Sequence, residues 1–303
     1  MFQIMKLERK SIDFMRWIKV SSFFSISIIV ISIFSILTRQ LNLGLDFTGG
    51  TLVEVRFKNP VNLASVRSIL NEKDFFNNNV IVQHLGSSHD IMIRFQSDHN
   101  QDLGIQVLNA LKHGNDENVK IRRVEFIGPV VGNELKESGI LAIIFSLICI
   151  LLYVSIRFEW RLAIGAILAL VHDLIITLGI FSIMQIEVDL TIIAALLTVI
   201  GYSLNDTVVI FDRIRENCNY KPNLTLSPDD IINNSITQTL NRTLITSGTT
   251  LFVVIALFTY GGTTFHGFAI ALCLGIIIGT YSSIYIASSL ALKLGITKKH
   301  FVN

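Results

Sequence analysis

Long apolar stretches dominate the hydrophobic pattern of this chain and recur almost to its end. A helix needs about 20 apolar residues to cross the hydrocarbon core of a membrane. Such stretches occur at Val20–Thr38, Ser138–Ile156, Leu162–Met184, Leu190–Phe211, Thr243–Tyr260 and Gly267–Leu292. The pattern therefore predicts a membrane all-α bundle of six transmembrane helices.

Residues 39–137, between the first two stretches, follow shorter periods. Strand-like segments, typified by strict alternation in the first of them, occur at Thr51–Phe57, Val80–Leu85, Ile91–Phe95 and Val119–Phe126. Helical spacing occurs at Val61–Leu70 and Gln101–Leu111. The resulting order, β-α-β-β-α-β, is that of a ferredoxin-like split βαβ unit. We therefore expect a small α+β ferredoxin-like domain outside the membrane.

Lysine and arginine lie beside alternate ends of the apolar stretches, whereas the short loops Gln185–Asp189 and Gly261–His266 contain neither. Because these residues accumulate on the cytoplasmic side, both termini are predicted to be cytoplasmic. The expected plan is a cytoplasmic N-terminal segment 1–19, a first transmembrane helix 20–38, a periplasmic domain 39–137, a five-helix bundle 138–292 that includes a cytoplasmic loop with an amphipathic helix at 212–238, and a cytoplasmic tail 293–303.

Composition supports a membrane protein that binds no nucleic acid. Only 16% of the residues are charged and 51% are hydrophobic, with mean hydropathy +0.57, whereas soluble domains carry about 25% charged residues. The net charge of +2 gives no nucleic-acid footprint. The three cysteines lack metal-site spacing, and the glycine-rich segment 43–50 lacks the lysine of a phosphate-binding loop. We expect no metal, no cofactor and no enzymatic centre.

Asp206 is the most informative polar residue because it interrupts the fourth apolar stretch. A charge near the middle of a bilayer costs about 2.5–3.5 kcal/mol, so such residues usually face the bundle interior and have a partner. Asp206 lies roughly 24 Å along its helix from Leu190, and Arg242 roughly 27 Å from Tyr260, so the two reach similar depths in adjacent antiparallel helices. They are candidates for a proton relay; alternatively, they lie at the cytoplasmic interface, with Arg242 as an anchor.

A second polar pair, His172 and Asp173, lies midway along the third stretch. Histidine titrates near neutral pH, so the pair is either a secondary relay or a structural hydrogen-bonded pair. Asn205 and Thr246 have the same two interpretations. Further hydroxyl residues of the fifth stretch, Ser247 among them, either line a wet path or let helices pack closely, and close packing also accounts for Ser282 in the sixth.

Several motifs resemble those of the SecD/SecF family of protein-export membrane proteins, across nearly the whole chain from Leu43 to Leu294. The motifs are Leu43–Gly50, Val124–Gly132, Arg157–Arg161, Val171–Asp173, Gly201–Asn217 and Gln238–Ser247. The Tyr-Ser-Leu-Asn-Asp variant at Tyr202–Asp206 is similar to the SecF members rather than the SecD members.

The resemblance implies an RND-like fold in the bacterial inner membrane and pairing with a SecD-like subunit. It also implies use of the proton motive force to assist export of unfolded polypeptides through the SecYEG channel, with YajC as an additional candidate partner beside membrane lipids and protons. Asp206 and Arg242 match family positions implicated in proton conduction. Two other functions remain open: an RND-type small-molecule exporter subunit, which would be expected to carry larger outer domains, and a passive assembly scaffold.

Overall fold

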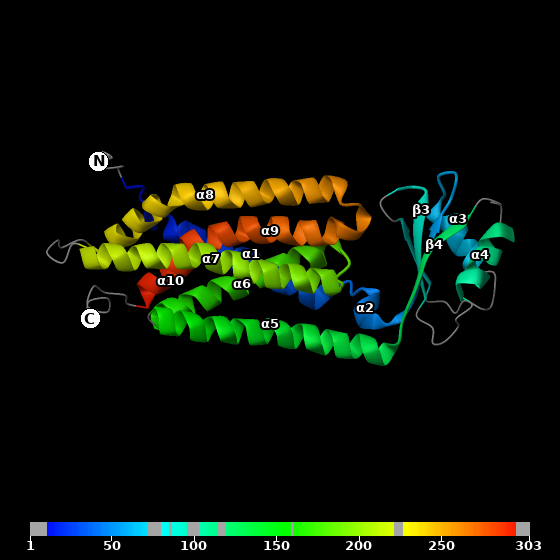
Figure 1. The fold of residues 1–303 in the computed structure, drawn as a ribbon, viewed down its shortest axis with the longest axis horizontal. Helices are drawn as coiled ribbons and strands as arrows, with labels where there is room; N and C mark the ends of the chain where they lie inside the picture. The colour runs from blue at the N-terminus through cyan, green and yellow to red at the C-terminus, as the bar shows by residue number, and fades with distance from the viewer. Residues whose placement is uncertain are drawn as a thin grey trace, which may run out of the picture.

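The computed structural model describes residues 11–71, 80–84, 87–95, 103–113, 119–158, 160–220 and 227–294. Parts of the expected N-terminal segment (1–10), loop (221–226) and tail (295–303), and the expected start of a helix at Gln101, lie outside the described residues. A helical bundle forms one end of the molecule and a sheet domain the other, and the described chain begins and ends at the end of the bundle far from the sheet domain (Figure 1).

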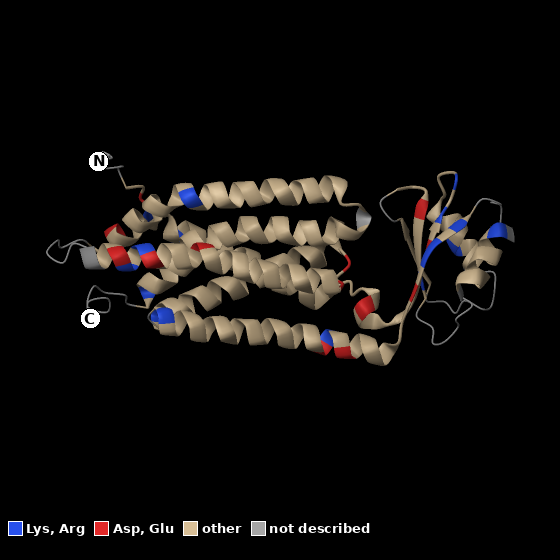
Figure 2. Ribbon diagram, in the orientation of Figure 1, with Lys and Arg blue, Asp and Glu red and all other residues tan. Residues whose placement is uncertain are grey.

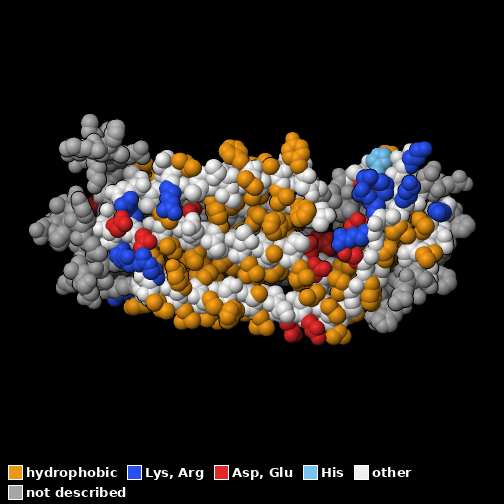
Figure 3. Space-filling view, viewed as in Figure 1, with side chains coloured by type: hydrophobic (Ala, Val, Ile, Leu, Met, Phe, Trp, Pro, Cys, Tyr) orange, Lys and Arg blue, Asp and Glu red, His pale blue; other side chains and the backbone are white. Residues whose placement is uncertain are grey.

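The structure agrees with the expected number of membrane helices, because six helices in the described part of the chain are long and apolar enough to cross a membrane. They begin with α1 (Ile18–Arg39), α5 (Pro129–Arg157), α6 (Trp160–Met184) and α7 (Leu190–Tyr220). They end with α8 (Pro228–Tyr260) and α9 (His266–Ser282), which continues through a π-helical turn at Ser283–Ala287 into α10 (Ser288–Lys293). Hydrophobic side chains cover the bundle between its charged ends (Figure 3).

Three helices extend beyond the apolar stretches that predict them. Helix α5 begins at Pro129 instead of Ser138. The polar residues before Ser138 continue the helix at the end nearest the sheet domain. Helices α7 and α8 together take up most of residues 212–238. The expected helix in this segment is present as the first turns of α8, whereas the expected loop before it is shorter because α7 continues to Tyr220. In the sequence, Ser227 followed by Pro228 and two aspartates predicts a helix start. The structure confirms it, because the Ser227 hydroxyl accepts from the Asp230 backbone N–H in a capping box.

The sheet domain contains β1 (Gly50–Arg56), α3 (Leu63–Asn71), β2 (Val80–His84), β3 (Asp90–Phe95), α4 (Leu103–His113) and β4 (Lys120–Ile127), in this order. The sheet order is β2-β3-β1-β4 and every neighbouring pair is antiparallel. Val53 pairs with Ile93 and Val124. Residues from β1, β2, β3 and both helices form one buried cluster, so the domain has its own core.

Short connections tie this domain to the bundle. Strand β1 follows the one-turn helix α2 (Leu45–Thr48) through Gly49, which has φ 66°, and only Gly128 separates β4 from α5. A side chain at Gly132 would approach the Gly49 nitrogen to 3.1 Å, so α2 and α5 pack backbone to backbone. A parallel bridge joins Leu43 to Val188, in the loop between α6 and α7.

Within the bundle, α6 contacts α1, α5, α7 and α9. Small residues allow these contacts: a Cβ at Gly179 on α6 would lie 2.2 Å from the Cβ of Ser32 on α1, and one at Gly275 on α9 would lie 2.1 Å from a methyl of Val199 on α7. Close approach through small residues is the usual means of helix association in membranes. The position of α7 against α6 and α9 follows from these contacts.

Candidate functional site

Asp206 on α7 points into the bundle, with 3% of its surface exposed. The Ser247 hydroxyl on α8 lies 3.5 Å from Asp206 Oδ2, at the long limit of a hydrogen bond. Ser247 Oγ also lies 2.9 Å from Thr280 Oγ1 on α9 and accepts from the Tyr202 hydroxyl at 3.3 Å. The Asp206 carboxylate, which lies between α7, α8 and α9, therefore faces a small network of hydroxyl groups.

Arg242 does not form an ion pair with Asp206. Both residues are described, and no contact within 4.0 Å joins their charged atoms. Arg242 is exposed on α8. The structure thus places the two expected relay residues on adjacent helices without a direct contact between them. The polar side chain on α8 that contacts Asp206 is Ser247.

The two minor candidates next to this site are Asn205 and Thr246. Asn205 is exposed on α7. The Thr246 hydroxyl donates to the carbonyl oxygens of Arg242 and Thr243, each at 3.0 Å, within its own helix. Neither residue, among those that the structure describes, is joined to Asp206 by a hydrogen bond.

His172 and Asp173 on α6 form a second, better-connected cluster. His172 Nδ1 lies 2.9 Å from Asp173 Oδ1, and the two residues are 4% and 1% exposed. Asp173 Oδ2 accepts from Ser203 Oγ on α7 at 2.7 Å and from Ser282 Oγ on α9 at 2.8 Å. One carboxylate therefore bonds groups on three helices, and Ser203 precedes Asp206 by three residues on α7.

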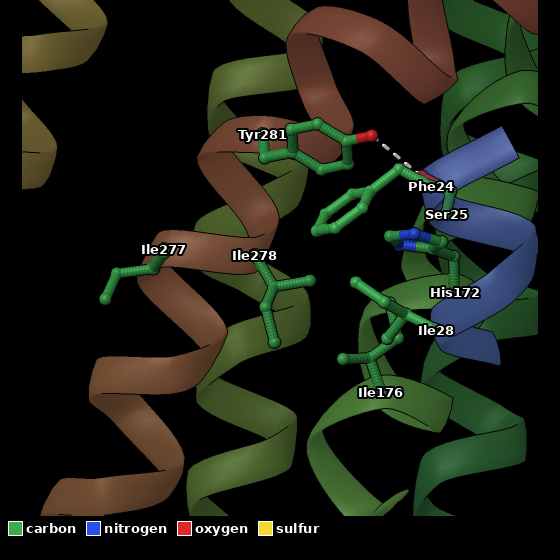
Figure 4. A pocket seen from close by; sticks show the side chains of 8 residues that line it. All are labelled: Phe24, Ser25, Ile28, His172, Ile176, Ile277, Ile278 and Tyr281. Carbon is green, nitrogen blue, oxygen red and sulfur yellow. Dashed lines mark hydrogen bonds between the residues drawn. The ribbon is translucent and has the colours of Figure 1, made fainter. Parts of the chain in front are cut away.

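The outer side of His172 borders a cavity of about 240 Å³ between α1, α6 and α9 (Figure 4). The ring lies 6.4 Å from that of Tyr281, in a stacked arrangement. The Tyr281 hydroxyl lies 2.6 Å and 2.9 Å from the Ser21 and Ser25 hydroxyls of α1. His172 Nε2 is buried and has no partner in the described part of the chain.

These two clusters can hold and pass protons, because each joins a buried carboxylate to hydroxyl groups. The described residues contain no group of three side chains able to hold a metal ion. Sequence reasoning identified both carboxylates and His172 but did not single out Ser203 or Thr280, and it attributed Ser282 to packing. Ser203 and Thr280 each lie three or four residues from another small polar residue in the same membrane helix. This spacing is a weak signal of a functional role, because it does not show which neighbouring helix that face contacts.

Comparison with known proteins gives a consistent result. Residues 106–297 match the family described as protein export membrane protein SecD/SecF, C-terminal, and residues 34–61 match the SecD/SecF GG motif. A protein translocase subunit SecF from Vibrio alginolyticus is 61% identical over 305 aligned residues, which cover 100% of this chain and 95% of that protein. One from Escherichia coli O157:H7 is 46% identical, covering 97% and 91%.

The fold is similar to that of SecDF from Thermus thermophilus, described as a translocon-associated membrane protein. Its crystal structure superposes with a TM-score of 0.85 at 34% identity, covering 95% of this chain and 39% of that one. A second SecDF structure, in a super-membrane-facing form, gives a TM-score of 0.69 at 33% identity. The present chain thus corresponds to less than half of the SecDF chain.

Proposed function

The chain belongs to the SecD/SecF family of protein-export membrane proteins, and we propose that it is a SecF-type subunit that couples the proton motive force to Sec-dependent export. The observation that carries the coupling is the buried carboxylate of Asp206 beside the Ser247 hydroxyl. An ionisable group inside a membrane bundle is costly, and such groups usually serve ion or proton pathways.

A SecD-like subunit is the partner that the comparisons favour, because the similar SecDF chain contains much more than this chain spans. We further propose that the pair acts with the SecYEG channel and YajC on an unfolded polypeptide leaving the membrane. The proposed driving force is the proton gradient, because Asp206 is an ionisable group buried inside the bundle.

The proposed location is the bacterial inner membrane, with both termini in the cytoplasm. Outside the sheet domain, most lysine and arginine residues lie at the end of the bundle where the described chain begins and ends (Figure 2). Arg157, Arg161, Arg213 and Arg215 all lie on this side, at the ends of α5, α6 and α7. Arg39 at the end of α1 and Lys136 near the start of α5 lie at the opposite end. This asymmetry favours a cytoplasmic end, which puts the sheet domain in the periplasm.

The sheet domain is proposed to be a ferredoxin-like unit. Its element order β-α-β-β-α-β and its antiparallel sheet order β2-β3-β1-β4 are the supporting observations. A domain of this size has little room for the substrate pocket of a small-molecule exporter. The proposal therefore favours protein export over that alternative.

In the proposed relay, Asp206 takes up a proton and releases it on the other side, while Arg242 supplies the nearby positive charge. The exposed guanidinium can approach Asp206 when the carboxylate is ionised and withdraw when it is neutral. Ser247 offers the carboxylate a hydroxyl in both states, because a hydroxyl group can donate or accept. His172 and Asp173 are proposed as a supporting cluster that holds α6, α7 and α9 together.

The test is export of a secreted reporter, with and without an uncoupler, in cells depleted of the native protein. Asp206→Asn keeps nearly the same shape but cannot ionise, so we expect insertion and SecD pairing to persist while uncoupler-sensitive export is lost. Asp212→Asn is the matched control, because Asp212 lies exposed on the same helix beside Arg157. Full uncoupler-sensitive export by Asp206→Asn would refute the relay and leave the protein as an assembly scaffold.

A further inference from the structure

A buried arginine of the sheet domain contacts two connecting segments at the adjacent end of the bundle. The Arg94 side chain on β3 is 6% exposed. Its Nη1 and Nη2 atoms donate to the Leu43 carbonyl oxygen at 3.1 Å and 2.6 Å. Nη2 also lies 3.5 Å from Glu187 Oε1. One side chain therefore joins the sheet to the segment that follows α1 and to the loop between α6 and α7.

The two bundle segments are themselves fastened by backbone hydrogen bonds. The Gly44 N–H donates to the Val188 carbonyl at 2.7 Å, and the Val188 N–H donates to the Asn42 carbonyl at 2.8 Å. Glu187 is thus fixed to the bundle, so a change in its attraction to Arg94 acts on the sheet domain and not on the loop.

Glu187 is the counter-charge for a guanidinium that has left water. A buried charge is tolerated when it is paired, and removing one partner leaves an uncompensated charge that is strongly unfavourable. Arg94 Nε is already buried without a partner among the described residues. The Leu43 carbonyl satisfies hydrogen bonds but carries no net charge, so a neutral Glu187 would leave Arg94 unstable in this position.

Ionisable groups are also found on the segments that border the loop between α6 and α7. Asp189 lies in the same loop and Asp46 on α2, and both disfavour a second negative charge. On α1, Arg39 is engaged by the Ile183 carbonyl at 3.3 Å. On α9, His266 stacks on Phe258 with 4.7 Å between ring centroids.

Burial raises the pKa of Glu187, and Asp189 and Asp46 act in the same direction, against Arg94 and a hydrogen bond from the Leu45 backbone. Glu187 therefore binds a proton at a higher pH than an ordinary glutamate does. As the pH falls, it becomes neutral while ordinary surface carboxylates are still charged.

We propose that Arg94 and Glu187 form a latch that holds the sheet domain on the bundle while Glu187 is ionised, and that opens when Glu187 takes up a proton. This latch goes beyond the relay at Asp206. Only its exposure to the periplasmic proton reservoir rests on the proposed topology.

The latch is tested on the full chain in lipid nanodiscs, by the distance distribution between spin labels at Ser68 on α3 and Thr259 on α8. Both positions are exposed, and the background has Cys149, Cys218 and Cys273 replaced. We expect a narrow distribution at pH 8 that broadens at pH 5. Glu187→Gln should be broad at both values, whereas Glu134→Gln, an exposed glutamate on α5, should behave as the unmodified chain does.

Arg94→Lys serves as a second probe, because it keeps the charge and removes the planar fork of donors. We expect it to broaden at a higher pH than the unmodified chain. A distribution that does not change with pH, or a Glu187→Gln chain that still narrows at pH 8, would overturn the proposal. Neither result depends on export, so the latch and the proposed function can fail separately.

Discussion

Asp173 should be a structural hub, and its substitution gives the sharpest test of that role. In Asp173→Leu, the Ser203 hydroxyl, the Ser282 hydroxyl and the His172 imidazole all lose their bond to this residue. The Ser282 hydroxyl keeps the Gly279 carbonyl at 3.1 Å as a second acceptor. In Asp173→Asn, by contrast, the amide oxygen can replace Oδ2 and accept from both serines, while the amide nitrogen can donate to His172 Nδ1 in the other neutral tautomer.

The magnitudes follow from the number of bonds. Hydrogen bonds between membrane helices contribute about 0.6 kcal/mol each on average, so three of them give about 2 kcal/mol. Leaving buried polar groups unpaired costs about 1–3 kcal/mol more. We therefore expect Asp173→Leu to lower the free energy of unfolding by about 3–5 kcal/mol and Asp173→Asn by less than about 1 kcal/mol.

The assay is reversible unfolding of the purified protein in mixed micelles, followed by tryptophan fluorescence or circular dichroism. A loss in Asp173→Asn as large as that in Asp173→Leu would refute the hydrogen-bond account and show that the charge of Asp173 is needed. If Asp173→Asn is stable but fails to restore uncoupler-sensitive export, Asp173 belongs to the proton path and not only to the framework.

Two further predictions concern packing and pH. Gly275→Ala should destabilise the bundle by about 1–3 kcal/mol, because its Cβ would lie 2.1 Å from a Val199 methyl. Val199→Ala removes both methyls but leaves its Cβ 2.9 Å away, so it should restore part of the loss in the same unfolding assay, and no rescue would contradict the close contact. The hydrogen bond from Arg56, with further contributions from Ser87 and Arg122, holds the pKa of Asp90 below its ordinary value despite partial burial. Its stabilisation is therefore present above the ordinary carboxyl range and is lost as the pH falls through the lowered pKa. Thermal melting between pH 6 and pH 3 should show a smaller acid loss in Asp90→Asn than in the unmodified chain, and equal slopes would refute this account.

The sequence was sufficient for features that depend on local pattern. Apolar length located the spans, strand alternation located the sheet, and Ser227 with Pro228 marked a helix start that the capping box confirms. Helix ends were less predictable. The polar residues after Pro129 can lie outside the hydrocarbon and remain helical, so apolar length underestimates α5.

For the candidate sites too, the sequence predicted what depends on local pattern and missed what depends on the packing of helices against each other. A carboxylate in an apolar stretch is conspicuous in one dimension, so Asp206 and Asp173 could be found. Their partners Ser203 and Ser282 depend on how α7 and α9 are rotated against α6, which no single helix pattern specifies. The contact between Arg94 and Glu187 joins residues 93 positions apart in different domains, and nothing near either residue in the sequence indicates the other.

The short connections of the sheet domain restrict how it can move. Its chain enters through Gly49 beside β1 and leaves through Gly128 beside β4, and these strands are neighbours in the sheet. The two chain connections therefore define an axis of rotation along one side of the domain. Arg94, on β3, makes a third contact with the bundle away from that axis. In the proposed latch, release of Arg94 leaves both connections intact, so the domain is expected to rotate about the line that joins them instead of reorienting freely.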